Sequence, residues 1–131
     1  MNNENDEFLV VDDDPNMCWA LQHILDMQGY RSKIALSAQE TLALITPGCF
    51  RLVFLDAKLP DMEGLELARR IREIDPAICI VMVSGYFYND DIVVQNALED
   101  GLICSFIAKP FLHHEIIKTI KTFPSPQSPL V

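Results

Sequence analysis

The sequence predicts an α/β protein in which helices cover both faces of a parallel β-sheet. Short apolar runs and longer amphipathic stretches alternate five times along the 131 residues, which is the pattern of consecutive βα units in one domain. Several of the runs are apolar at almost every position, as expected for strands that are buried on both faces. Polar or turn-forming residues follow each run and separate it from the next amphipathic stretch.

Five strands are expected. The first is a short apolar run that ends at an acidic triplet beginning with Asp12, and the third ends at Asp56. The second alternates polar and apolar residues and is the most polar of the set, which suits an edge of the sheet. The predicted strands are residues 8–11, 30–36, 52–55, 78–83 and 103–108.

The helices are predicted from apolar residues at helical spacing and from residues typical of helix ends. Asp14 followed by Pro15 is typical of an N-cap and a first helical position. Gly29 is placed to end the first helix, and Gly101 to end the fourth. The predicted helices are residues 15–28, 38–45, 67–74, about 90–99 and 112–120.

The connections and the polar second strand predict the strand order. Right-handed crossovers favour the flavodoxin-like order 2-1-3-4-5, a doubly wound (βα)5 sandwich in which strands one and three lie side by side. The polar residues 1–6 are expected to be disordered, and the Pro/Ser-rich residues 123–131 to form a tail or linker. Residues 7–122 remain as the folded domain.

Composition limits the function classes. The net charge of −9 argues against direct binding to nucleic acid or to an anionic membrane surface. No apolar run approaches the ~20 residues that cross a bilayer, and the polar start is no signal peptide, so we expect a cytoplasmic protein. The four cysteines form no Cys-x-x-Cys pair, and we expect small buried hydrophobic residues in a reducing compartment, with Cys49 the most exposed.

Polar residues with matching chemistry follow four of the five strands. They are Asp12 and Asp13, Asp56, Ser84 and Lys109. The carboxyl ends of parallel strands open on one edge of the sheet, so these side chains can converge there. Crowded carboxylates repel one another, and an all-oxygen acidic site suits Mg²⁺. A carboxylate nucleophile beside a metal, a lysine and a hydroxyl predicts phosphoryl transfer onto Asp56. Each of these residues alone could be an ordinary turn or capping residue. Their occurrence together, at the ends of four strands, favours a phosphoryl-transfer site.

The same residues resemble the signature of two-component response-regulator receiver domains of the CheY-like superfamily. The segments that carry the resemblance are Val10-Val11-Asp12-Asp13-Asp14, Leu55-Asp56 with Pro60 and Gly64, Val83-Ser84-Gly85, and Ala108-Lys109-Pro110-Phe111. The resemblance covers residues 7–122 and implies that Asp56 is the phosphoacceptor. It implies that Asp13, Asp56 and the backbone carbonyl of Lys58 ligate Mg²⁺ directly, and that Asp12 reaches the ion largely through water.

The resemblance also assigns the switch residues. Ser84 stands at the hydroxyl position, Lys109 at the phosphate-binding lysine and Phe106 at the aromatic switch position. The Lys109-Pro110 peptide bond is expected to be cis. Ser84 replaces the more frequent threonine and so lacks a methyl group. Phe106 replaces the frequent tyrosine and so cannot make a phenolic hydrogen bond.

The implied function is that of a phosphoacceptor in a phosphorelay and not of a conventional enzyme. A sensor histidine kinase or phosphotransfer protein would phosphorylate Asp56. The face of the fourth helix, fifth strand and fifth helix would then control an output domain or effector, with a homodimer as a possible form. The alternative within the family is a degenerate receiver that binds partners without phosphorylation, against which the intact acidic cluster and Lys109 argue.

Two other classes of protein fit less well. A small phosphohydrolase with an aspartyl nucleophile would resemble haloacid dehalogenases and would need a second aspartate two residues after Asp56, where this chain has Lys58. A nucleotide- or flavin-binding module would need a glycine-rich phosphate loop after the first strand, and the sequence has none there.

Overall fold

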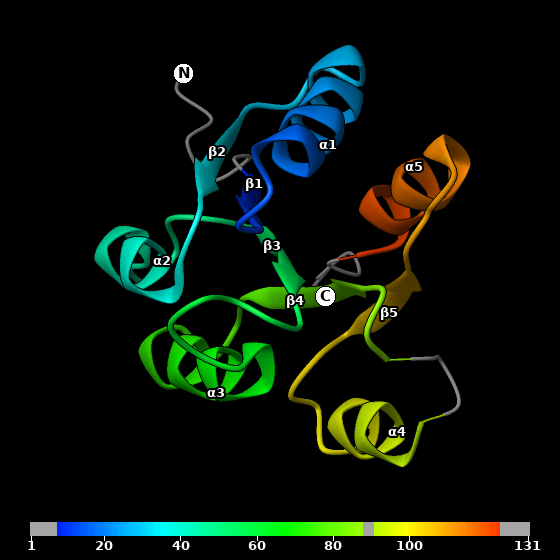
Figure 1. Cartoon of the computed structure of the whole chain (residues 1–131). Helices are drawn as coiled ribbons and strands as arrows, with labels where there is room; N and C mark the ends of the chain where they lie inside the picture. The colour runs from blue at the N-terminus through cyan, green and yellow to red at the C-terminus, as the bar shows by residue number, and fades with distance from the viewer. Residues whose placement is uncertain (1–7, 88–90, 124–131) are drawn as a thin grey trace, which may run out of the picture.

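The computed structural model describes residues 8–87 and 91–123 and contains the parallel five-stranded sheet that the sequence predicts (Figure 1). The strand order is β2-β1-β3-β4-β5, as expected. The strands are β1 (Phe8–Val11), β2 (Ser32–Ala35), β3 (Leu52–Asp56), β4 (Cys79–Ser84) and β5 (Ser105–Ala108). The predicted disordered start at residues 1–6 and the predicted tail at residues 123–131, apart from Phe123, lie outside the described residues.

Five helices cover the two faces of the sheet. They are α1 (Pro15–Met27), α2 (Ala38–Leu44), α3 (Gly64–Ile74), α4 (Ile92–Glu99) and α5 (His113–Thr122). In Figure 1, α1 and α5 lie together on one face, and α2, α3 and α4 lie on the other. Each face has its own apolar core, so this is the doubly wound sandwich expected from the sequence.

Strand β3 shows why the apolar runs form the centre of the sheet. Val53 and Leu55 point into the core beneath α2 and α3, whereas Leu52 and Phe54 point into the core beneath α1 and α5. All four side chains are buried, because successive residues of a strand face opposite sides and both sides are covered here. The next residue, Asp56, is the first of the strand that is only partly buried.

Strands β2 and β5 are shorter than the sequence predicts. Tyr30 donates its N–H to the Leu25 carbonyl and so closes α1, and the N–H of Leu36 donates to the Glu40 carboxylate and caps α2. At β5, the N–H groups of Leu102 and Ile103 both donate to a carbonyl in the last turn of α4. These backbone groups complete helix ends instead of joining the sheet, which alternation of residue types does not reveal.

The helix ends follow the predicted signals. Asp14 accepts a hydrogen bond from the N–H of Asn16 at 3.0 Å and forms the N-cap of α1, with Pro15 as the first helical residue. Gly29 and Gly101, after α1 and α4, have φ of +87° and +75°, which residues with a Cβ adopt at a cost. The predicted start of α4 near Asp90 lies outside the described residues.

Gly64 lets α3 begin directly against the end of β3. Its N–H donates to the Ala57 carbonyl at 2.7 Å, so the two backbones touch. A Cβ at position 64 would lie 2.7 Å from the Ala57 Cα and 2.9 Å from its carbonyl oxygen. Gly64 therefore sets the position of the loop that follows the candidate phosphoacceptor.

Gly64→Ala is expected to destabilise the fold by about 1–3 kcal/mol, because backbone atoms must move to admit the methyl group. Urea denaturation measures the effect. Gly85→Ala is the matched control, since its Cβ would meet the Lys109 Cβ only at an ordinary 3.7 Å. Equal loss of stability in the two variants would contradict the close-approach explanation.

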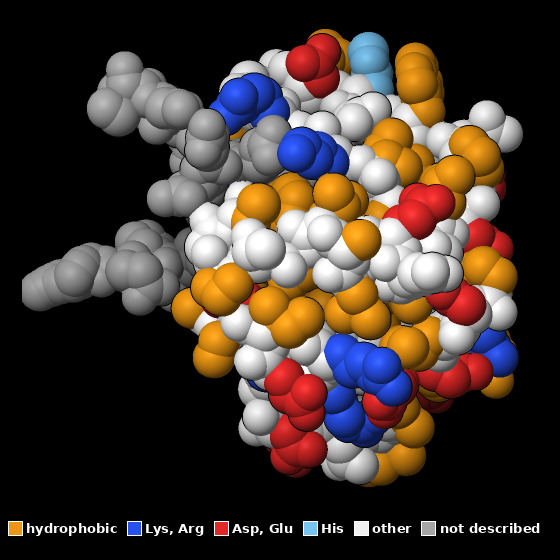
Figure 2. Space-filling view, turned by 90° about the vertical axis from the view of Figure 1, so that its left-hand side faces the viewer, with side chains coloured by type: hydrophobic (Ala, Val, Ile, Leu, Met, Phe, Trp, Pro, Cys, Tyr) orange, Lys and Arg blue, Asp and Glu red, His pale blue; other side chains and the backbone are white. Residues whose placement is uncertain are grey.

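The surface mixes charges of both signs. On the α2 side, shown in Figure 2, hydrophobic side chains are interspersed with Lys, Arg, Asp and Glu side chains. Over residues 8–87 and 91–123, no helix has the length and apolar character needed to span a bilayer.

Candidate functional site

Three aspartates converge where β1 and β3 end. The two strands are paired so that Val11 lies beside Leu55, which places the residues that follow them, Asp12 and Asp56, side by side. Each of Asp12, Asp13 and Asp56 offers a carboxylate oxygen, and these three atoms lie within 4.8 Å of one another. Asp12 is buried, the Asp56 side chain is 12% exposed and Asp13 is exposed, so the cluster opens to solvent on one side. The predicted acidic cluster is therefore present.

Lys109 reaches the cluster from the end of β5. Its Nζ lies 2.7 Å from Oδ2 of Asp12 and 3.5 Å from Oδ1 of Asp56, and only 20% of its side chain is exposed. The Lys109 N–H donates to the Ser84 carbonyl at 2.9 Å, and the Lys109-Pro110 peptide bond is cis, as predicted. The closer partner of the ammonium group is Asp12, a buried carboxylate that needs a positive charge beside it.

Burial and charge act in opposite directions on the ionisation of the site. Burial raises the pKa of the Asp56 carboxyl, and the negative charge of Asp12 raises it further, while Lys109 opposes both. Burial also favours the neutral form of Lys109, but Asp12 and Asp56 outweigh it, so the pKa of this lysine lies above its ordinary value. The lysine is therefore cationic, and the ionised form of Asp56 is disfavoured first by burial and then by the charge of Asp12.

Ser84 is a fully buried residue at the end of β4. Its Oγ accepts hydrogen bonds from the N–H groups of Tyr86 at 2.8 Å and Phe87 at 3.4 Å. These bonds hold the start of the loop after β4 and leave the hydroxyl proton of Ser84 available for another acceptor.

Lys58 and Tyr86 meet beside the cluster. The Lys58 Nζ lies 4.4 Å from the centre of the Tyr86 ring and 3.6 Å from a carboxylate oxygen of Glu63. The side chain of Lys58 is thus directed to these two residues, whereas the predicted metal ligand is its backbone carbonyl. Phe106, on β5, is half-buried against the core beneath α2, α3 and α4.

Two residues near the site have roles that sequence reasoning missed. Both carboxylate oxygens of Asp61 accept N–H groups at the start of α2, from Ala38 at 2.9 Å and Gln39 at 3.0 Å, and these bonds lower the pKa of Asp61. Asp61 therefore joins the loop after β3 to α2. The buried thiol of Cys18 donates to the Asp12 carbonyl at 3.2 Å, and burial raises the pKa of this thiol to about 12.

The predicted cysteine environments need one correction. Cys18 and Cys79 are buried as expected and Cys49 is half-buried, but Cys104 is also half-buried and not a core residue. It lies directly before the edge strand β5, which has a neighbouring strand on one side only.

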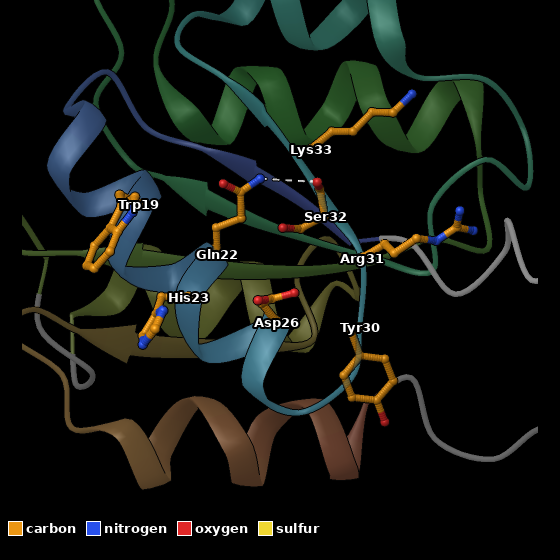
Figure 3. A pocket seen from close by; sticks show the side chains of 8 residues that line it. All are labelled: Trp19, Gln22, His23, Asp26, Tyr30, Arg31, Ser32 and Lys33. Carbon is orange, nitrogen blue, oxygen red and sulfur yellow. Dashed lines mark hydrogen bonds between the residues drawn. The ribbon is translucent and has the colours of Figure 1, made fainter.

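A surface hollow of about 470 Å³ lies elsewhere, between α1 and β2 (Figure 3). The rings of Trp19 and His23 stack at 5.1 Å on one wall, and Gln22 donates to the Ser32 carbonyl at 3.2 Å across it. None of the residues that line it belongs to the acidic cluster, so this hollow is separate from the candidate site.

Comparison with known proteins agrees with this geometry. Residues 8–121 match the response regulator receiver domain family. Sporulation initiation phosphotransferase F of Bacillus subtilis (strain 168) is 31% identical over 119 residues, which are 91% of this chain and 94% of that protein. The C4-dicarboxylate transport transcriptional regulatory protein DctD of Rhizobium meliloti (strain 1021) is 31% identical over 86% of this chain. The match spans only 24% of that protein.

Solved structures are similar over nearly the same residues. A CheY-like receiver domain protein from Methanospirillum hungatei JF-1 superposes with a TM-score of 0.80 at 33% identity, covering 88% of this chain and 90% of that one. The response regulator TrrA from Thermotoga maritima, solved in complex with Mg²⁺ and BeF, superposes with a TM-score of 0.76 at 28% identity. That match covers 88% of this chain and 96% of TrrA.

The fold and the acid–lysine cluster at the strand ends define a receiver-type signalling domain, a class distinct from conventional enzymes. The chain belongs to the response regulator receiver domain family. The predicted family and fold are therefore confirmed.

The raised pKa of Asp56 has a consequence for stability. A carboxyl whose pKa is higher in the folded chain binds more protons when folded, so its contribution to stability falls as pH rises from the ordinary value of 3.8 through the raised one. In the metal-free protein at pH 7, Asp56→Asn is therefore expected to raise stability, on the order of 1 kcal/mol. The gain should shrink as pH approaches 3.8.

Thermal unfolding at several pH values measures this difference. Asp26→Asn, at an exposed position on α1, is the control and should have little effect. A metal-free Asp56→Asn protein that is less stable than the parent at pH 7 would contradict the conclusion that burial and the charge of Asp12 disfavour ionised Asp56.

Proposed function

We propose that this receiver domain accepts a phosphoryl group on Asp56 from a phosphohistidine and uses the acyl phosphate as a switch. The observation that carries the proposal is the placement of three carboxylates within 4.8 Å of one another beside a lysine ammonium group. This arrangement supplies a nucleophile, a cation site and a positive charge for a phosphoryl oxygen, which are the parts that phosphoryl transfer needs.

The acidic cluster fits Mg²⁺, because it offers several converging carboxylate oxygens and opens to solvent. Asp13, Asp56 and the backbone carbonyl of Lys58 would hold the ion directly, and Asp12 largely through water. Bound there, Mg²⁺ would neutralise negative charge on the carboxylates and on the incoming phosphoryl group. The Mg²⁺–BeF complex of TrrA supports this assignment.

In the transfer step, an Oδ atom of Asp56 attacks the phosphorus of a phosphohistidine on the donor protein. The phosphorus–nitrogen bond breaks, its electron pair returns to the imidazole, and an acyl phosphate forms on Asp56. Lys109 lies 3.5 Å from Oδ1 of Asp56, so its ammonium group is within reach of an oxygen of a phosphoryl group placed there. Hydrolysis of the acyl phosphate returns the domain to its starting state.

The switch would run from Ser84 to the face formed by α4, β5 and α5. The hydroxyl proton of Ser84 can donate to a phosphoryl oxygen, which would draw the loop after β4 toward Asp56. Phe106 would then repack inward and favour a minor conformation of α4, β5 and α5. A hollow of about 490 Å³ between β5 and α5, lined in part by Phe106, His114 and Lys118, gives this face room for an effector.

The proposed phosphoacceptor function also indicates the partners. We expect a sensor histidine kinase or phosphotransfer protein as donor, and an output domain or effector protein, with a cytoplasmic location. The match spans about a quarter of DctD but nearly all of sporulation initiation phosphotransferase F, so a linked output domain and a separate effector protein both fit the relatives.

Binding of beryllofluoride, a stable mimic of the phosphoryl group, tests the proposal without a kinase. Fluorine NMR should detect a bound species that requires Mg²⁺ and is lost in Asp56→Asn. A folded parent protein with no bound signal at saturating Mg²⁺ would support the phosphorylation-independent receiver instead.

The contact between Lys58 and Tyr86 predicts a longer phosphoryl lifetime than an open site allows. Lys58 lies two residues after Asp56 and Tyr86 two residues after Ser84, and their side chains contact each other, so we infer that the pair shields the site and that Tyr86→Ala speeds hydrolysis of the acyl phosphate several-fold by admitting water. Loss of the phosphoryl adduct with time measures the rate. Trp19→Ala removes an equally exposed aromatic ring outside the site and should leave the rate unchanged. Identical lifetimes in the parent and in Tyr86→Ala would refute this role.

A further inference from the structure

Two cysteines lie close together at the amino ends of β4 and β5. Cys79 is the first residue of β4, and Cys104 directly precedes β5. Both side chains pack on the α1 and α5 face of the sheet, in the same apolar cluster. The Cys104 N–H donates to the Ile80 carbonyl at 2.7 Å, and the two thiols lie within hydrogen-bonding reach of each other.

Arg72 fixes the two chain segments that carry the cysteines. Its guanidinium, on α3, donates to the carbonyl of Ile78, next to Cys79, and to the carbonyl of Leu102 at 2.8 Å, two residues before Cys104. One side chain therefore joins the start of β4 to the loop before β5. The proximity of the thiols is held by three elements and not by the strand pair alone.

The two thiols differ in exposure and in ionisation. A hydrogen bond from Cys79 lowers the pKa of the Cys104 thiol to about 6 in spite of its burial, with help from the Ile80 backbone and Arg72. The same interaction, together with burial, raises the pKa of Cys79. Cys104 is half-buried and Cys79 is buried, so the cysteine that ionises more readily is also the more exposed residue of the two.

We propose that Cys79 and Cys104 are a reversible dithiol–disulfide pair that reacts with low-molecular-weight disulfides. The Cys104 thiolate attacks one sulfur of the small disulfide, forms a mixed disulfide and releases one small thiolate. Cys79 then loses its proton to solvent and attacks the Cys104 sulfur, which expels the second small thiolate. Two protein thiols are oxidised to one disulfide, and one small disulfide is reduced to two thiols.

The geometry of neighbouring strands is compatible with the product. The register pairs Val81 with Ser105, so Cys79 and Cys104 lie on neighbouring strand segments, one residue out of register. With strands about 4.8 Å apart and about 3.3 Å of rise per residue, their Cα atoms are roughly 6 Å apart, within the roughly 4.4–6.8 Å that disulfides span. The new bond would join the amino ends of β4 and β5. Strand β4 ends at Ser84, and β5 leads to Lys109. Oxidation would thus act on the strands of the proposed switch from the end of the sheet opposite the acidic cluster.

The test incubates the full chain with oxidised glutathione at pH 7, stops the reaction with acid, alkylates free thiols and maps the peptides. Trypsin is unsuitable because no Lys or Arg lies between Arg72 and Lys109, whereas a glutamyl endopeptidase cleaves after Glu99 and separates the two cysteines. The expected product links Cys79 to Cys104 and disappears on reduction. It should form about tenfold faster or more from the folded chain than from the chain in urea.

Single substitutions separate the two steps. Cys79→Ser should stop at a glutathione adduct on Cys104, Cys104→Ser should form no adduct at either position, and Cys49→Ser should behave as the parent. Circular dichroism confirms that each variant is folded. The proposal is overturned if Cys49 reacts while Cys104 does not, if other cysteines are linked, or if urea leaves the rate unchanged.

Discussion

Asp56→Asn is expected to abolish phosphorylation of this chain by acetyl phosphate while leaving the fold intact. Asp56 lies at the end of β3, with a carboxylate oxygen within 4.8 Å of those of Asp12 and Asp13 and 3.5 Å from the Lys109 Nζ. An asparagine amide keeps the shape of the side chain but has no anionic oxygen to attack phosphorus. We expect the parent to gain one phosphoryl group by intact-mass measurement in Mg²⁺ and the variant to gain none.

Asp26→Asn is the matched control for this prediction, because it removes one exposed carboxylate from α1 outside the cluster. It should be phosphorylated as the parent is. An adduct that survives in Asp56→Asn would place the phosphoacceptor elsewhere and would contradict the assignment.

Lys109→Ala is expected to slow phosphorylation of Asp56 by about 10²–10³-fold, the usual cost of removing one group that stabilises developing negative charge. The variant also leaves the buried Asp12 carboxylate without its ion-pair partner at 2.7 Å, so the fold should be less stable. Mg²⁺ affinity should be equal to or higher than that of the parent, because a positive charge next to the acids is gone. Slower phosphorylation of Asp56 with retained Mg²⁺ binding is therefore the result that identifies Lys109 as a charge-stabilising residue.

Intact-mass measurements over time give the rate of phosphorylation by acetyl phosphate. Titration with Mg²⁺ followed by NMR gives the affinity for the metal ion. Lys121→Ala, on the exposed side of α5, is the control and should change neither. Loss of Mg²⁺ binding in Lys109→Ala would show that its effect is a general collapse of the site. A rate within a few-fold of the parent would contradict a role in charge neutralisation.

The sequence predicted most of the fold because the strands and the site follow from short-range patterns. Apolar runs such as Val53 to Leu55, which end in a carboxylate, place the acids at one edge of the sheet in any doubly wound fold. The N-cap at Asp14 and the stop at Gly29 are equally local, since each depends on neighbouring backbone groups. These features need no knowledge of how distant parts of the chain meet.

Long-range contacts could not be predicted in the same way. Lys109 was expected to serve the phosphoryl group on Asp56, yet it contacts Asp12 more closely, a choice set by packing distances. Asp61 reads as a turn residue, but its carboxylate binds the start of α2, more than twenty residues away. Arg72 likewise joins the segments before β4 and β5 through the carbonyls of Ile78 and Leu102, a contact that no local pattern reveals.

The phosphoryl group itself can be located on one residue. After treatment with acetyl phosphate and Mg²⁺, borohydride reduces an aspartyl phosphate to homoserine, and tryptic cleavage after Arg51 and Lys58 yields residues 52–58, in which Asp56 is the only acidic side chain. We predict homoserine at position 56 in this peptide and unmodified aspartates at Asp12 and Asp13. Homoserine elsewhere, or none in the folded protein with Mg²⁺ present, would contradict the account.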